Sequence, residues 1–237
     1  MEQLPICLNL KNRTVVVTGS GQQAARRACT ALRAGAKVNL VTQAQSAALD
    51  EVAQQSGVLV CMGQLEDTDL DDAFIVFAAS EDAGDNERVC KLARARSILV
   101  SSEHWQDCDF TIPSIIDRSP LLVAISSAGT SPLLVRLIAQ RLEATIPAAF
   151  GHLTRFLGQA RHAIAGKLPD RLMRRRFMEK LVDGPVADLV LAGDEGRAQA
   201  LMEQQADKFA AKDPSDVGEV YLVGGGPGDP DLLTFRA

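Results

Sequence analysis

A run of five β-branched residues followed at once by a glycine-rich turn constrains this chain more than any other stretch. Thr14-Val15-Val16-Val17-Thr18 predicts a fully buried parallel strand. Gly19-Ser20-Gly21-Gln22-Gln23-Ala24 comes next, and a helical pattern then runs to Gly35. In a dinucleotide-binding turn, glycines allow a tight bend and close approach of a pyrophosphate, and amides at the helix start supply the anion site. The stretch therefore predicts nucleotide binding, with a tight turn that binds no ligand as the alternative.

Strand and helix patterns alternate over the first 110 residues, which predicts an α/β fold of the Rossmann type. Further strands are expected at 37–42, 58–62, 74–79 and 97–102, and helices at 26–34, 47–55, from 66 onward and around 88. The fourth strand is apolar throughout, so we expect it in the interior of the sheet.

Ligands of such sheets lie beyond the C-terminal ends of the strands. At the end of the second strand, Thr42-Gln43-Ala44 stand where an acidic side chain usually binds a ribose. The side chains of Thr42 and Gln43 are able to hydrogen-bond a ribose, although an ordinary loop explains them equally well. Because no arginine follows, the sequence favours NAD over NADP.

Two further strand ends carry candidate residues. Ser80 and Asn86 are placed to border a nicotinamide or ribose, but Asp85 or Asn86 acting only as a helix cap explains the same pattern. Glu103 and His104 follow the fifth strand as a titratable pair suited to proton chemistry, with a solvated pair as the alternative.

The composition excludes several other classes of protein. The 237 residues are 46% apolar and 23% charged, which is typical of globular domains. A net charge of −5 gives no basic field for nucleic acid. No apolar run has the roughly 18 residues of a membrane span, and the N-terminus lacks a signal-peptide pattern. The five cysteines are scattered and odd in number, so we expect reduced thiols in a cytoplasmic protein and no bound metal.

The middle of the chain changes character. Strands are expected at 110–120 and 121–126, and two strands alone cannot bury both faces, so a second subunit is one candidate partner. The loop Ser126-Ser127-Ala128-Gly129-Thr130-Ser131-Pro132 predicts an anion cradle before a helix that Ser131 caps. That helix has an apolar face of Leu133, Leu134, Leu137, Ile138 and Leu142.

The last third is predicted to be helical from 150 to 209, with breaks at Pro169 and Gly184-Pro185. It carries a basic cluster, which indicates either a solvated helix face or a site for a polyanionic substrate: Arg171, Arg174, Arg175, Arg176 and Lys180. The tail contains a linker at 212–216, a strand at 219–223 and a glycine-rich turn, and resembles the first unit of a further domain.

Four segments together resemble the siroheme synthase family. They are LPICLNLKNRTVVVTGSG, AASEDAGDNERV, FTIPSIIDRSPLLVAISSAGTSPLLVRLIAQRLE and GEVYLVGGGPGDPDLLT. The first three resemble the N-terminal precorrin-2 dehydrogenase/sirohydrochlorin ferrochelatase module, and the last resembles the opening of the uroporphyrinogen-III C-methyltransferase domain. The resemblance implies a Rossmann domain at 1–113, a strand-and-helix dimerisation segment at 114–147, a helical domain at 148–213, and a linker with a truncated methyltransferase start at 214–237.

The resemblance also implies activities and partners. They are NAD-dependent oxidation of precorrin-2 and insertion of ferrous iron into sirohydrochlorin at one site, in a homodimer that acts on tetrapyrroles. A catalytically degenerate NAD-binding module, or a chelatase alone, is the alternative. A methyltransferase is a rival class to which only the tail points.

Site residues follow from the resemblance position by position. Gln22 and Gln23 lie at the NAD phosphates, and Gln43-Ala44 at the ribose and adenine edge. Asn86 matches an asparagine of the nucleotide motif. Glu103 stands where the family has its key aspartate, Ser127 matches an active-site serine, and His104 is a candidate helper.

Three residues depart from the family pattern. Ser20 replaces the middle glycine of the turn, which an outward side chain would tolerate. Ala128 replaces a glycine and is expected to stiffen the serine-rich loop. Glu103 is one methylene longer than aspartate, a shift of roughly 1 Å that is able to cost about 10²-fold in a demanding geometry.

Overall fold

The computed structural model describes residues 3–102 and 108–211. The chain divides into two compact units, which are described separately. The first is built from residues up to Ser114 together with Ala124–Ala139, and the second from Ile115–Val123 together with the residues from Gln140 onward.

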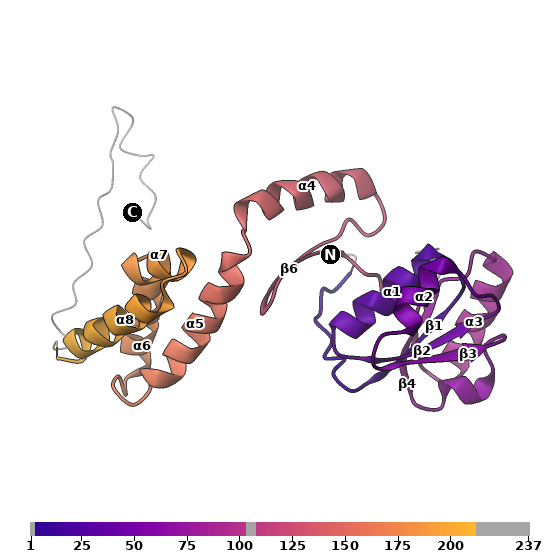
Figure 1. Ribbon diagram of the computed structural model, residues 1–237, viewed down its shortest axis with the longest axis horizontal. Helices are drawn as coiled ribbons and strands as arrows, with labels where there is room; N and C mark the ends of the chain where they lie inside the picture. Colours follow the sequence, from indigo (N-terminus) through magenta and orange to yellow (C-terminus); the bar gives the residue numbers. More distant parts are fainter. Residues whose placement is uncertain (1–2, 103–107, 212–237) are drawn as a thin grey trace, which may run out of the picture. The chain divides into compact units, whose positions relative to one another are not determined.

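The first unit is organised around a five-stranded parallel sheet (Figure 1). Its order is β3-β2-β1-β4-β5, with β1 in the centre and the crossover between β1 and β4. The strands are β1 (Thr14–Thr18), β2 (Lys37–Thr42), β3 (Val58–Met62), β4 (Ala73–Ala78) and β5 (Leu99–Ser102). The predicted Rossmann-type sheet is confirmed, and the C-terminal ends of β1, β2 and β4 meet at one edge.

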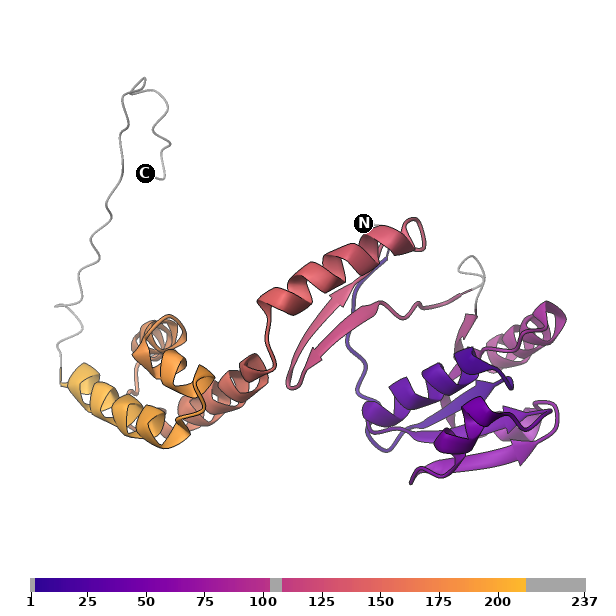
Figure 2. The ribbon, with the colours of Figure 1, turned by 45° about the horizontal axis from the view of Figure 1, so that its top comes forward.

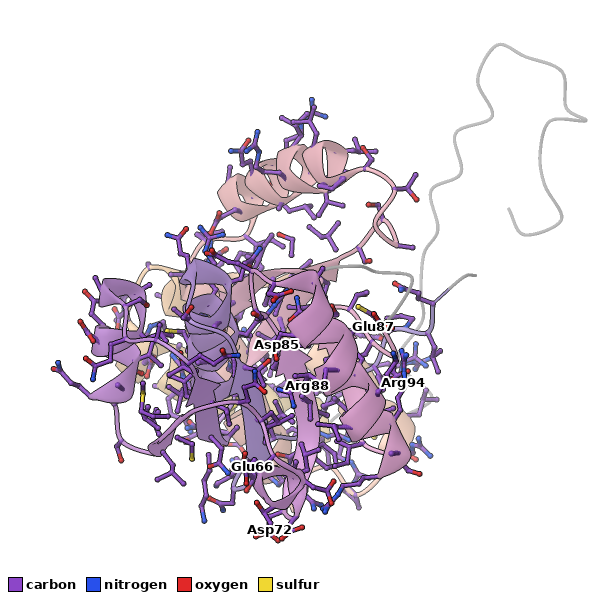
Figure 3. The ribbon with its side chains drawn as sticks, turned by 90° about the vertical axis from the view of Figure 1, so that its right-hand side faces the viewer. Glu66, Asp72, Asp85, Glu87, Arg88 and Arg94 are labelled. Atoms are coloured by element: carbon purple, nitrogen blue, oxygen red, sulfur yellow. The ribbon has the colours of Figure 1, made fainter. Side chains whose placement is uncertain are left out.

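Helices cover both faces of this sheet, because successive residues of β1 point to opposite sides. Val15 and Val17 belong to the apolar cluster beneath α1 (Gln22–Arg33) and α2 (Ala47–Ala53). Val16 belongs to the cluster beneath α3 (Ala83–Ala95), whose labelled residues Asp85, Glu87, Arg88 and Arg94 appear in Figure 3. All three valines are completely buried, which explains the unbroken apolar run in the sequence.

Two expected elements differ from the structure. The helix expected from residue 66 is a single 3₁₀ turn, η1 (Asp67–Leu70), because Glu66 and Asp69 form a capping box and β4 begins at Ala73. The strand expected at 110–120 is confined to β6 (Ser114–Arg118). Phe110 and Ile112 instead pack against the cluster beneath α1 and α2.

The connecting elements leave apolar side chains uncovered. Strand β6 pairs only with β7 (Leu121–Ile125) among the described residues, in a two-stranded sheet. Helix α4 (Pro132–Thr145) has no buried residue. Its expected apolar face is exposed at four positions, Leu133, Leu134, Leu137 and Ile138.

The second unit has its own helical core, which Figure 2 shows at the orange end of the ribbon. Its helices are α5 (Ala149–Ala163), α6 (Arg171–Val182), α7 (Pro185–Leu191) and α8 (Glu195–Ala210). Phe177 and Leu181 are fully buried there. The breaks predicted at Pro169 and Gly184-Pro185 are confirmed, and Pro185 stands in the first turn of α7. No helix within the described ranges is long and apolar enough to cross a membrane.

Candidate functional site

The glycine turn after β1 is held between the ends of two neighbouring strands. Gly19 has φ +118°, and its amide donates a hydrogen bond of 3.1 Å to the carbonyl of Val41 in β2. The amide of Ala79, after β4, donates a bond of 3.1 Å to the carbonyl of Thr18. A Cβ on Gly19 would lie 2.3 Å from the carbonyl oxygen of Ala79. Only glycine fits this position, for reasons of both conformation and space.

The start of α1 meets the requirements of a phosphate site. Gly21 is the N-cap residue, no side chain caps the helix in the part of the chain that the structure describes, and the amide of Ala25 is the first to bond back to Gly21. The amides of the preceding turn therefore lack intrahelical acceptors. Gln22 and Gln23 are both exposed beside them. A close-packed glycine backbone next to open amides fits a dinucleotide pyrophosphate.

Ser20 is compatible with this turn. Its backbone is outside the left-handed region, where the non-glycine residues among those described are Asn12, Ser97 and Ala128. The hydroxyl of Ser46 donates a 2.5 Å hydrogen bond to the carbonyl of Ser20 and so ties the turn to the start of α2. The serine therefore replaces a glycine without backbone strain.

The end of β2 separates the three residues predicted there. Thr42 is buried, and its hydroxyl donates to the carbonyl of Ala44 at 2.8 Å. That hydroxyl shapes the local turn, whereas Gln43 and Ala44 are exposed. Of the three candidates, Gln43 and Ala44 remain predicted ribose or adenine contacts, and Thr42 serves the backbone of the loop.

The end of β4 corrects the expected helix cap. The cap of α3 is Asp82, whose carboxylate accepts a 2.8 Å hydrogen bond from the amide of Gly84. Asp85 forms an ion pair with Arg88, which also donates to the carbonyl of Leu65. The side chain of Asn86 is buried and bonds to the backbone of Ser80. Neither Asp85 nor Asn86 caps the helix, since each has another partner.

The end of β5 leads into the segment that carries two predicted residues. Glu103 and His104 lie outside the described residues. On either side of that segment, the thiol of Cys108 donates to the carbonyl of Ser102 at 3.0 Å and accepts from its amide at 3.1 Å. Asp109 accepts from the amide of Val100 at 2.9 Å.

A shallow depression lies beside the ends of β4 and β5. Its lining residues are Gln23, Arg27, Phe77, Ala78, Ala79, Ser101 and Ser102. The Arg27 guanidinium lies 5.9 Å from the centroid of the Phe77 ring. Sequence reasoning missed Arg27, although it stands one helical turn beyond Gln23 on the same face of α1.

The serine-rich loop before α4 satisfies its own amides. The hydroxyl of Ser127 accepts a 3.0 Å bond from the amide of Ser131, and that of Ser126 accepts a 3.1 Å bond from Ala128. The amide of Thr130 donates to the carbonyl of Ser127. Ser127 is half-buried, and its predicted role at an active site stays a prediction.

Part of the basic cluster on α6 has internal partners. Arg174 donates to the carbonyls of Leu168 and Pro169 and so holds the turn before the helix. Arg175 pairs with Glu179, whose hydrogen bond raises the pKa of the guanidinium. These two arginines have structural roles, which favours the interpretation of a solvated helix face for them.

Comparison with known proteins defines the class. Residues 6–114 match the family described as "Putative NAD(P)-binding", and this range contains the whole parallel sheet. The first unit is therefore a Rossmann-type domain of the NAD(P)-binding class. Residues 149–205 match the "Sirohaem synthase dimerisation region".

The relatives identify the family. The chain is 39% identical to a siroheme synthase of Nitrosococcus oceani and 42% identical to siroheme synthase 1 of Serratia proteamaculans, in each case over all of this chain and 50% of the relative. It thus spans about half the length of the curated relatives it matches. A solved structure named "SirC, precorrin-2 dehydrogenase" is 26% identical with a TM-score of 0.72, covering 87% of this chain and 100% of that one. The resemblance to the siroheme synthase family is confirmed, whereas the domain boundaries predicted above stay predictions.

Proposed function

We propose that this chain performs the NAD-dependent oxidation of precorrin-2 to sirohydrochlorin, and that the same site inserts ferrous iron to give siroheme. The observation that carries the proposal is the glycine turn, because the Ala79 carbonyl leaves no room for a Cβ while the start of α1 stays open. The relationship to a precorrin-2 dehydrogenase supports the choice of substrate. The same relationships support iron as a second substrate of the site.

The residues of the chain divide the work in this proposal. NAD, when bound, supplies the hydride acceptor. The amides at the start of α1, with Gln22 and Gln23, bind its phosphates, and Gln43 lies at the adenine ribose. Glu103 takes up the proton that the tetrapyrrole loses with the hydride, so that two hydrogens leave the macrocycle. During metal insertion, the same carboxylate accepts pyrrole N–H protons as Fe²⁺ binds the ring nitrogens.

The decisive measurement is NADH formation at 340 nm under anaerobic conditions, with precorrin-2 supplied enzymatically. We expect turnover that needs the protein, NAD and precorrin-2 together. Glu103→Ala is expected to lose at least 10²-fold in kcat, whereas Glu51→Ala, an exposed residue of α2, serves as a matched control. Full turnover by Glu103→Ala would refute the role of the acid. NAD binding without NADH formation would favour the chelatase-only alternative.

Iron insertion is tested separately with sirohydrochlorin and Fe²⁺, by following the absorbance of siroheme. A common site predicts that Glu103→Ala slows both reactions. Loss of the oxidation alone would assign the two reactions to different groups.

We also propose that the chain forms a homodimer and that the second copy covers the apolar face of α4. That face exposes Leu133, Leu134, Leu137 and Ile138, and a family match to a dimerisation region lies within the same chain. Leu134→Glu should shift the mass in light scattering from dimer to monomer. Leu172→Glu, at an equally exposed leucine of α6, is the control. An unchanged dimer in both variants would place the interface elsewhere.

A further inference from the structure

Asn86 has an unusual set of contacts for a residue in the first turns of a helix. Only 4% of its surface is exposed. Its Oδ1 accepts a 2.9 Å hydrogen bond from the amide of Ser80, and its Nδ2 donates a 2.7 Å bond to the carbonyl of the same residue. A carboxamide carries both a donor and an acceptor, so one side chain satisfies both backbone groups of Ser80.

The segment that Asn86 holds forms the wall of the glycine turn. The atoms nearest to a Cβ built on Gly19 are the carbonyl group of Ala79, at 2.3 and 2.6 Å, and the amide nitrogen of Ser80, at 2.9 Å. Glu81, the next residue, approaches Gly21 from the same side. A small displacement of Ser80 would therefore change the space available to a ligand above the turn.

Other residues of this loop do not duplicate the contact. The hydroxyl of Ser80 accepts from the amide of Asp82 at 3.2 Å, and Asp82 itself caps α3. Both bonds stabilise the start of the helix. Only the bonds of Asn86, among those described here, join the interior of α3 to the backbone beside Gly19.

We propose that Asn86 is a positioning residue of the nucleotide site, which sets the shape of the glycine turn through the backbone of Ser80 without touching the nucleotide. This inference rests on the proposed NAD-dependent function. It replaces the direct contact with nicotinamide or ribose that the sequence suggested for Asn86.

The substitution Asn86→Asp tests the proposal. Aspartate keeps the acceptor for the Ser80 amide but sets a second oxygen against the Ser80 carbonyl. We expect the dissociation constant of NAD, measured by fluorescence, and the KM for NAD to rise about tenfold or more, with kcat at saturating NAD changed less than threefold. Asn86→Ser, which keeps a small polar side chain, is the second variant if Asn86→Asp does not fold.

Two controls separate positioning from general stability. Ser80→Ala removes the hydroxyl and leaves the backbone bonds, so NAD affinity should stay within twofold of the wild type. Val89→Ala removes a fully buried contact of α3, and should lower the melting temperature while leaving the KM for NAD unchanged.

Specific results would overturn the inference. A folded Asn86→Asp protein with NAD affinity within twofold of the wild type would do so, as would an equal loss of affinity in Val89→Ala. If the wild type binds and oxidises normally in those experiments, the proposed function survives and only the role of Asn86 falls. A wild-type protein that binds no NAD would overturn both.

Discussion

The turn before α1 and the loop before α4 have similar sequences and opposite hydrogen bonding. Both are short runs of glycine, serine and other small residues that lead into a helix. Around Gly19 the backbone is held by β2, β4 and the segment at Ser80, and no side chain caps α1 in the described chain. In the loop at 126–131 the hydroxyls of Ser126 and Ser127 accept from amides of the loop itself. An anion site at a helix start thus depends on whether other parts of the protein hold the backbone.

The largest effect that tests this comparison is expected from Gly19→Ala. The new Cβ would meet the Ala79 carbonyl, and φ +118° is unfavourable for alanine, so we expect a loss of about 3 kcal/mol or more in stability. NAD affinity should fall by roughly 100-fold in any protein that folds. Gly63→Ala is the control, because φ there is +136° but no atom lies within 4 Å of a new Cβ. Equal melting curves and affinities for the two variants would contradict the steric argument.

A smaller effect is expected from Ser127→Ala in the second loop. The amide of Ser131 would lose its acceptor, which costs about 1 kcal/mol of stability by analogy with helix caps. Chemical denaturation measures this cost. The NAD dissociation constant should stay within twofold, since the loop satisfies its own amides. A large loss of NAD affinity would show that this loop also binds the nucleotide.

Ala128→Gly is expected to stabilise the protein slightly. Ala128 has φ +49°, a region that costs alanine about 1–2 kcal/mol, while the extra freedom of glycine in the unfolded chain offsets about 0.5–1 kcal/mol. The net gain should be about 0.5 kcal/mol in urea denaturation. A destabilised variant would mean that the methyl group of Ala128 makes contacts that outweigh the strain.

The smallest effect lies outside both turns and sets the baseline for them. The hydrogen bond from Arg96 lowers the pKa of Asp67, so this pair stabilises the folded state above the unfolded pKa and is lost as pH falls through the folded pKa. Because the pair is exposed, Arg96→Gln should reduce the melting temperature only slightly at pH 7 and not at all at pH 2 to 3. Thermal denaturation across that pH range checks the sign, and a difference that grows toward acid pH would contradict it.

Local sequence predicted the elements of the first unit well, because buried parallel strands and glycine punctuation leave few alternatives. The limits of β1, β2 and β3 agree with the expected ranges residue for residue. The partners of Asn86 and Thr42 were not predictable, since both bond to backbone groups whose positions depend on how loops close. Cys108 and Arg27 gave no motif, and their places beside Ser102 and Phe77 come from the way the chain returns past β5 and from the rotation of α1.

The three apolar clusters draw their residues from 10–112 and from 153–209, with no residue shared between the two ranges. Two separate sources of buried apolar area imply two separate heat-absorption peaks on warming, so a single melting temperature is not a defined quantity for this chain. Because a ligand stabilises only the part that binds it, NAD should move one calorimetric peak upward and leave the other in place.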